Sequence, residues 1–256
     1  MPIYFHSGKH ARWQERIWKL MHNERPLLSS SLMRRFAIFA VIVLVLVATL
    51  NGGIKWYGDR ILQATHTTAT DEVLISIGND RLTLAKNTLR VPSERQDGER
   101  ERVDLYLTWP ELRGYEDANR AVFDDPSRAA GLIYVQLSQS TMSEDMSGRF
   151  GPIYSRLTEG EPVPLKHGLM LHRLRADSGY GKEVILTGQR EGENDYVVRC
   201  LLPQTPQEAT GSDCQRDIHA GQDLSLFYRF SASLLPQWVK LDADIKHYVE
   251  QRLVKD

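Results

Sequence analysis

The chain lacks the short motifs that mark the common enzyme classes. It has no His-Glu-x-x-His pattern, no Gly-x-Ser-x-Gly nucleophile elbow and neither of the glycine-rich nucleotide-binding patterns. Cysteine is scarce, with two residues in 256. We therefore predict no catalytic, cofactor-binding or metal-binding residues, and we interpret the protein as a non-enzyme.

The chain also has little net charge of either sign. Its 32 Lys and Arg residues against 33 Asp and Glu residues give a formal net charge of -1. Much of the basic excess lies in the first 35 residues, so the remainder is mildly acidic. Binding to nucleic acid requires a basic patch that neutralises phosphates, so we expect no nucleic-acid partner.

The residue types that often support catalysis are present without a recognisable arrangement. His167 and His172 are five residues apart, which is no standard zinc spacing. The adjacent carboxylates Asp124 and Asp125 are typical of a helix end. A hydrolase acting on the cell wall or on polysaccharide is an alternative, and it requires His167, His172 or Asp124 to face one another across a pocket.

What the sequence does contain is one long apolar run. Residues 36–50 carry no charge and no proline, and the run continues to Ile54. At about 1.5 Å per residue this length crosses a hydrocarbon core. The run is apolar on every side, which is typical of membrane helices. We predict a transmembrane signal-anchor helix over residues 34–56; a cleaved signal peptide and a buried core helix are the alternatives.

Charge predicts the orientation of this helix. Arg34 and Arg35 precede the run, and basic residues outnumber acidic ones before it. Because an excess of Lys and Arg stays in the cytoplasm, residues 1–33 are predicted to be a cytoplasmic basic arm. The main domain then lies in the periplasm of a bacterial inner-membrane protein. Trp56 and Tyr57 fit the aromatic belt at the outer interface.

Two further segments flank the anchor. Residues 10–22 of the arm have the apolar spacing of a small basic amphipathic helix. Residues 57–71 are polar and threonine-rich, and predict a stalk or a fraying end of the anchor helix.

Residues 72–256 are predicted to form one periplasmic β-rich domain. Strands are expected at residues 73–77, 81–85, 88–91, 103–109, 131–138, 168–174, 183–187, 196–202 and 223–230. Short turns join most of them, which favours antiparallel pairing. The predicted fold class is α+β: β-rich and mostly antiparallel, with a C-terminal amphipathic helix, preceded by one transmembrane helix.

Helices are expected at three places in this domain. The first is short and covers residues 115–123, and the second covers residues 143–156, before a proline-bearing loop at 159–167. The last begins after Ser231 or Ser233 and buries one apolar side against the sheet. Its opposite side is predicted to be exposed and holds Lys240, Asp242, Asp244, Lys246, Glu250 and Arg252.

Both cysteines, Cys200 and Cys214, lie in the predicted exported domain. An even pair in such a domain suggests a disulfide closing a loop of about 15 residues. A metal-binding pair or two free thiols are the alternatives.

Several local sequences resemble a known group of proteins. These are Ile77-Gly-Asn-Asp-Arg-Leu, Trp109-Pro110 and Phe230-Ser-x-x-Leu-Leu-Pro-x-Trp238. With the basic arm and the single anchor, they resemble uncharacterised membrane-anchored envelope proteins of Gram-negative bacteria. This resemblance implies the same topology and brings no activity or catalytic residues.

The first functional hypothesis is therefore a single-pass inner-membrane protein whose periplasmic domain binds or scaffolds other envelope proteins. The hydrolase described above is the second hypothesis. A periplasmic ligand sensor that signals to the arm is the third.

Overall fold

The computed structural model describes residues 30–192 and 194–254, and for residues 30, 32, 54–65 and 206 it describes the backbone alone. The predicted helix at residues 10–22 and the side chains of Trp56 and Tyr57 lie outside this description. The chain divides into two compact units, Met1–Asp59 and Arg60–Asp256, and each is considered by itself.

The apolar run lies in helix α2, which covers Ser30–Thr65. Its segment Met33–Gly53 is long and apolar enough to cross a membrane, and none of that segment is buried. The core helix of a soluble protein would be mostly buried, whereas a membrane anchor and a signal sequence both have these properties. Helical backbone continues to Thr65, through much of the segment predicted as a stalk.

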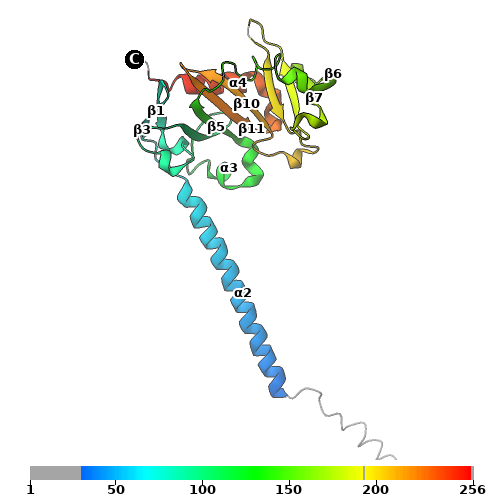
Figure 1. The fold of residues 1–256 in the computed structure, drawn as a ribbon. Coiled ribbons are helices and arrows are strands. Elements are labelled where there is room, and N and C mark those ends of the chain that lie inside the picture. The colour runs from blue at the N-terminus through cyan, green and yellow to red at the C-terminus, as the bar shows by residue number, and fades with distance from the viewer. Residues whose placement is uncertain (1–29, 193, 255–256) are drawn as a thin grey trace, which may run out of the picture. The chain divides into compact units, whose positions relative to one another are not determined.

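The second unit is built on an eight-stranded sheet (Figure 1). The strand order is β4-β5-β11-β10-β9-β8-β7-β6, and every neighbouring pair is antiparallel. The strands are β4 (Arg102–Thr108), β5 (Leu132–Gln139), β6 (Thr158–Pro164), β7 (Leu169–Leu174), β8 (Val184–Gly188), β9 (Tyr196–Cys200), β10 (Cys214–Ala220) and β11 (Leu224–Phe230). The predicted α+β, mostly antiparallel fold class is confirmed.

A three-stranded sheet has the order β2-β1-β3, with β1 (Glu72–Ile77), β2 (Asp80–Ala85) and β3 (Gly98–Glu99). Strands β1 and β2 form the predicted hairpin. Its turn is tied to the turn between β10 and β11, because the Asp80 carboxylate accepts hydrogen bonds from the amides of Gln222 and Asp223. Gly221 permits this contact, since an added Cβ would lie 2.4 Å from Asp80 Oδ1.

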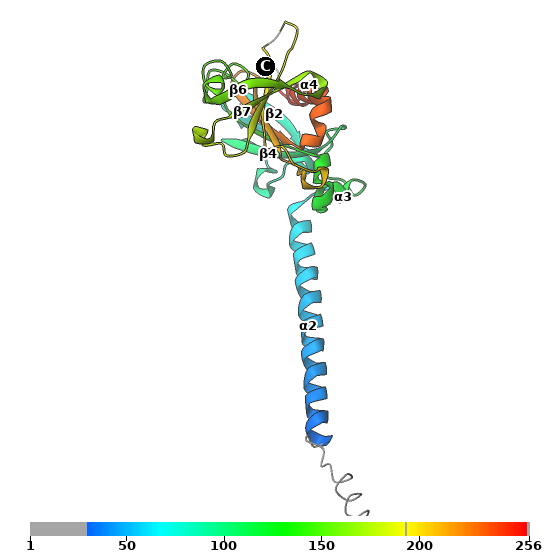
Figure 2. The same ribbon diagram turned by 90° about the vertical axis from the view of Figure 1, so that its right-hand side faces the viewer.

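The main core lies under helix α4 (Trp238–Glu250), which is labelled in both ribbon views (Figures 1 and 2). Leu241, Ile245 and Val249 of this helix are fully buried against strand side chains. A 3-10 turn, Ala232–Gln237, leads into α4, and the Ser231 side chain caps it by accepting a hydrogen bond from the Ser233 amide. The predicted apolar side of the C-terminal helix is confirmed.

Helix α3 is shorter than predicted and covers Arg120–Asp124. The second predicted helix is wrong, because within residues 143–156 only the start of a 3-10 turn, Tyr154–Leu157, is helical. The paired glycine and proline at 151–152 break helical periodicity there.

The structure also corrects the predicted strands at three places: two strands of the large sheet were not predicted, and one predicted strand is absent. Residues 158–164 form strand β6 where a loop was expected; β6 is an edge strand, where prolines are tolerated. Residues 88–91 form no strand, and Leu89 makes a single bridge to Leu105. Strand β10 was missed because an arginine, Arg216, occupies one of its inward positions.

Candidate protein-binding face

Where β4, β5 and β11 lie side by side, one side of the large sheet is buried and the other is partly exposed. Tyr134 pairs with Arg229, and Gln136 pairs with both Phe227 and Asp104. Directly paired residues project on the same side of a sheet. These five side chains, together with Arg90, are called the open face below.

The open face contains a hollow of about 260 Å³. Its side-chain lining comes from Arg90, Asp104, Tyr134, Gln136, Phe227 and Arg229. Two of these residues are cationic, one is anionic and two are aromatic. We call this feature the arginine hollow.

Backbone pairing places Arg90 at the arginine hollow. Leu89 bridges to Leu105 of β4, and the Arg90 amide donates a 2.8 Å hydrogen bond to the Asp104 carbonyl. The Arg90 guanidinium lies 5.7 Å from the centre of the Tyr134 ring. Such a cation–π contact is worth about 0.5–1 kcal/mol at an exposed site and orients the guanidinium.

Arg229 reaches the same hollow from β11. Its guanidinium lies 5.1 Å from the centre of the Phe227 ring. Within the described part of the chain, neither Arg90 nor Arg229 has a carboxylate at ion-pair distance. Asp104 also lines the hollow, and its carboxylate lies 4.0 Å from Arg102. The open face therefore presents two guanidinium groups whose charges lack a partner among the described residues.

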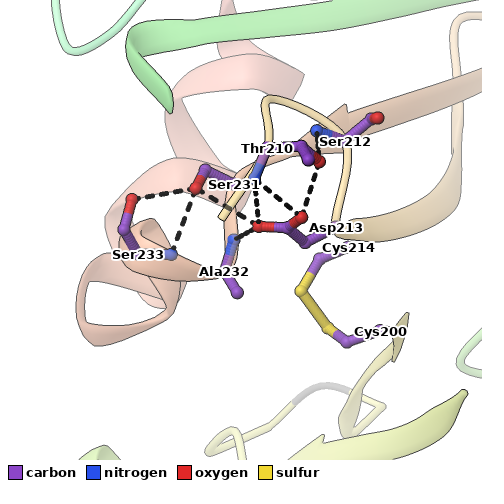
Figure 3. Close-up of a disulfide and its surroundings, with 8 residues drawn as sticks. All are labelled: Cys200, Thr210, Ser212, Asp213, Cys214, Ser231, Ala232 and Ser233. Atoms are coloured by element: carbon purple, nitrogen blue, oxygen red, sulfur yellow. Dashed lines mark hydrogen bonds between the residues drawn. A yellow bond between two sulfur atoms is a disulfide. The ribbon is translucent and has the colours of Figure 1, made fainter. Parts of the chain in front are cut away.

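A loop held by the cysteine pair forms one wall of the arginine hollow. Cys200 and Cys214 are paired across β9 and β10, with their sulfur atoms 2.08 Å apart, at disulfide distance (Figure 3). Gly211, in the loop between them, lies so close to β5 that an added Cβ would be 3.2 Å from the Tyr134 ring. Gly211 and Ser212 also line the hollow.

The end of this loop is fixed by the Asp213 carboxylate (Figure 3). It accepts hydrogen bonds from the amide and hydroxyl of Thr210 at 2.9 and 2.6 Å, and from the amide of Ala232 at 3.0 Å. The loop is thus joined both to itself and to the start of the C-terminal helical segment. This arrangement gives the hollow a defined wall.

The residues that the hydrolase hypothesis requires have different neighbours. His172 is hydrogen-bonded to Thr187 at 2.9 Å, whereas the His167 carbonyl accepts a hydrogen bond from Trp238. Asp124 lies 3.5 Å from His66. The contacts recorded for the described residues do not bring His167, His172 and Asp124 together across one pocket.

His66 is half-buried among aromatic rings. It stacks on Tyr115 with ring centres 4.6 Å apart, and its Nδ1 lies 3.0 Å from the Tyr106 hydroxyl. Burial lowers the pKa of His66, although Asp124 acts in the opposite direction. This cluster packs α3 on the sheet through Phe123, and it is a structural contact.

Sequence reasoning missed a second polar cluster, which lies beneath α4. Asp242 was predicted to be exposed but is 3% exposed. Its carboxylate accepts hydrogen bonds from Arg216 at 2.8 Å, from Arg190 at 2.5 Å and from the Tyr228 hydroxyl. Burial opposes the ionisation of Asp242, but the two guanidinium groups outweigh it and lower its pKa.

This cluster borders a larger groove between α4 and residues 189–192, with a volume of about 1220 Å³. Arg216 also donates hydrogen bonds to Ser147 and to the Val197 carbonyl. Burial lowers the pKa of Arg216, but contacts with Tyr228 and Asp242 outweigh burial and raise it. These bonds tie α4 to β9, β10 and β11. In the described chain, no group of three or more His, Cys, Asp or Glu residues could hold a metal ion.

The predicted orientation residues Arg34 and Arg35 lie in the first turns of α2. The positions of Trp56 and Tyr57 fall in the later part of that helix, where the backbone alone is described. The membrane orientation therefore stays a prediction.

Comparisons with known proteins give two structural neighbours. No protein-family model matches the chain, and no curated protein matches it. One neighbour is Smlt3025, an immunity protein of the Stenotrophomonas maltophilia type IV secretion system, with 12% identity and a TM-score of 0.49 over 74% of this chain and 96% of the neighbour. The other is the Neisseria meningitidis iron-regulated outer membrane lipoprotein FrpD, with 11% identity and a TM-score of 0.46 over 73% of this chain and 94% of the neighbour. Function is therefore inferred from the residues of this chain.

Proposed function

We propose that this chain is a single-pass inner-membrane protein whose periplasmic domain binds another envelope protein through the open face. The observation that carries this proposal is the pair of exposed guanidinium groups, with no carboxylate at ion-pair distance among the described residues, beside two partly exposed aromatic rings on the open face. In this proposal, residues 34–56 anchor the chain, residues 57–71 separate the bilayer from the domain, and residues 72–256 form that domain.

The composition of the open face supports a protein partner. Tyrosine and arginine dominate the binding energy of many protein interfaces, and phenylalanine is enriched there too. Tyr134, Phe227 and Arg229 supply such residues on a backbone that is fixed by strand pairing. Arg90 adds another on a backbone that is hydrogen-bonded to Asp104 of β4. A preformed surface loses little conformational entropy when a partner binds.

The anchor and the cysteine pair support the location. The exposed apolar helical segment Met33–Gly53 contains most of the apolar run of the sequence, and Arg34 and Arg35 lie at its N-terminal end. Disulfides persist in oxidising compartments such as the bacterial periplasm. The pair Cys200–Cys214 therefore agrees with an exported domain.

The alternatives draw less support from the described residues. The hydrolase lacks its required grouping of His167, His172 and Asp124. A ligand sensor would use the groove beneath α4. The charged Arg216 and Asp242 side chains there already form an ion pair with each other.

Site-specific photo-crosslinking of the full-length protein in membranes tests the proposal. A photo-reactive phenylalanine derivative replaces Phe227 on the open face, and in a matched strain it replaces Val239, which is 59% exposed on α4. We expect defined crosslinked adducts from position 227 and none of the same mass from position 239. Equal adducts from both positions, or no adduct from position 227, would contradict binding through the open face.

A further inference from the structure

The arginine hollow is a local exception to the charge of the domain around it. Residues 1–71 contain nine of the 32 basic residues and four of the 33 acidic ones. Residues 72–256 therefore contain 23 basic and 29 acidic residues, a net charge of -6. On this acidic domain, the side chains lining the hollow carry two positive charges and one negative charge.

The chemistry of the arginine hollow matches a carboxylate. A guanidinium group binds a carboxylate through two parallel hydrogen bonds, and such charge-assisted bonds are stronger than neutral ones. The Phe227 and Tyr134 rings restrict the two guanidinium groups, which lowers the entropy lost on pairing. The Gln136 amide and the Ser212 hydroxyl supply further donors on the lining.

The size of the hollow favours a side chain over a free small molecule. Its volume of about 260 Å³ is below the roughly 300–1,000 Å³ typical of small-molecule pockets. Long polyanions are disfavoured as well, because the field of a domain with a net charge of -6 repels nucleic acid and anionic lipid surfaces. A single carboxylate on a folded partner can pair with the two arginines while the rest of the partner adds the least repulsion with the acidic domain.

We propose that the arginine hollow receives an Asp or Glu side chain from the protein partner, with its carboxylate paired to Arg229 and Arg90. This inference rests on the proposed function and adds the chemistry of the partner. The hollow then selects partners by one acidic side chain, and Asp104 limits the site to a single carboxylate by repelling a second one.

A display experiment tests this inference without a known partner. The full-length protein is held in phosphatidylcholine nanodiscs and presented with a phage library of short disulfide-constrained loops of random sequence. We expect the selected loops to share one Asp or Glu position. Their Kd should rise at least tenfold in Arg229→Glu and in Arg90→Glu, and it should rise with NaCl concentration because screening weakens the ion pair.

Arg173→Glu is the matched control. Arg173 is an exposed arginine on β7 of the same sheet, away from the hollow, so its reversal makes the same charge change. We expect its Kd to change less than about twofold. The neutral variant Arg229→Gln separates lost attraction from added repulsion, and unchanged urea midpoints show that the variants are folded.

Three results would overturn the assignment. Selected loops without a shared acidic residue would do so, as would acidic loops that bind Arg229→Glu as tightly as the natural protein. Binding to phosphatidylglycerol vesicles, or dimerisation, that is lost in the same variants would reassign the hollow to a lipid headgroup or to a second copy. Crosslinks from position 227 together with selected loops that lack an acidic residue would refute a carboxylate as the ligand of the hollow. The proposed function would then still stand. Acidic loops without any crosslinks in membranes would instead contradict the proposed function.

Discussion

Removing the Asp242 carboxylate should destabilise the domain strongly, and Asp242→Asn is the test. The carboxylate receives hydrogen bonds from Arg216, Arg190 and Tyr228, and Arg216 is only 2% exposed. The amide is neutral, so a buried guanidinium loses its counter-charge. Breaking a buried ion pair in this way costs about 3–5 kcal/mol.

The expected loss is large compared with the total stability of a domain. Natural domains unfold with free energies of about 5–15 kcal/mol, so Asp242→Asn would remove a substantial part. Pulse proteolysis of the full-length protein in detergent micelles, across a urea series, measures the free energy of unfolding. The matched control is Asp244→Asn on the same helix, whose exposed pair with Lys240 is worth at most about 1 kcal/mol.

The double variant Arg216→Met/Asp242→Leu refines this prediction. It removes both charges and leaves apolar side chains of similar length, so its loss should be smaller than that of Asp242→Asn. Arg190 limits the recovery because it also donates to Asp242. A loss below about 1 kcal/mol in Asp242→Asn, or an equal loss in the double variant, would refute the reasoning.

Three further predictions follow from other parts of the domain. Gly221→Ala should lower the free energy of unfolding by more than about 1 kcal/mol, because Gly221 has φ of 60° and the added Cβ would meet a carboxylate oxygen. Urea unfolding measures this loss, and the control Gly151→Ala, with open space around the added Cβ, should be near neutral. Burial lowers the pKa of His172, so its contribution to stability is full above the unfolded pKa of about 6.5 and decreases as pH falls through the lower folded pKa; His172→Gln should flatten that part of the stability–pH curve. Cys200→Ser/Cys214→Ser should cost about 3 kcal/mol in the chain-entropy model and weaken crosslinking from the open face, and unchanged melting and crosslinking would contradict the role of the loop as a wall.

Local patterns predicted most of the strands for physical reasons. Val103, Leu105 and Leu107 are apolar at every second position and are all buried, and this period of two places them on one side of a strand. The C-terminal helix was equally clear, because its apolar side repeats at helical spacing. Both signals depend on neighbours in sequence.

The errors arose where a polar residue is buried or where distant segments meet. Asp242 lies at a helical position that looks exposed until Arg216 of β10 is placed opposite it. That same arginine hides the alternation of β10. Prolines made β6 resemble a loop. An edge strand tolerates proline, because the amide hydrogen that proline lacks is not needed on the side without a partner strand.

The open face illustrates the second kind of error. Its residues come from β4, β5, β11 and the segment that carries Arg90, and the strand order that joins the three strands follows from non-local pairing. Alternation marks each outward side chain separately and says nothing about which strands are neighbours. The arginine hollow therefore could not have been predicted from any single stretch of sequence.

Arginine has two separable roles in this domain, and the difference between them decides how each variant should be interpreted. Arg216 is buried and paired, so its substitution should change stability and affect binding only through unfolding. Arg229 is exposed and lies on an aromatic ring, so its substitution should change binding and leave stability nearly unaltered. Loss of binding in Arg229→Glu at an unchanged urea midpoint can then be assigned to the open face itself. If substitution of Arg229 lowers stability as much as substitution of Arg216, the open face is part of the structural framework. The binding surface must then be sought elsewhere on the domain.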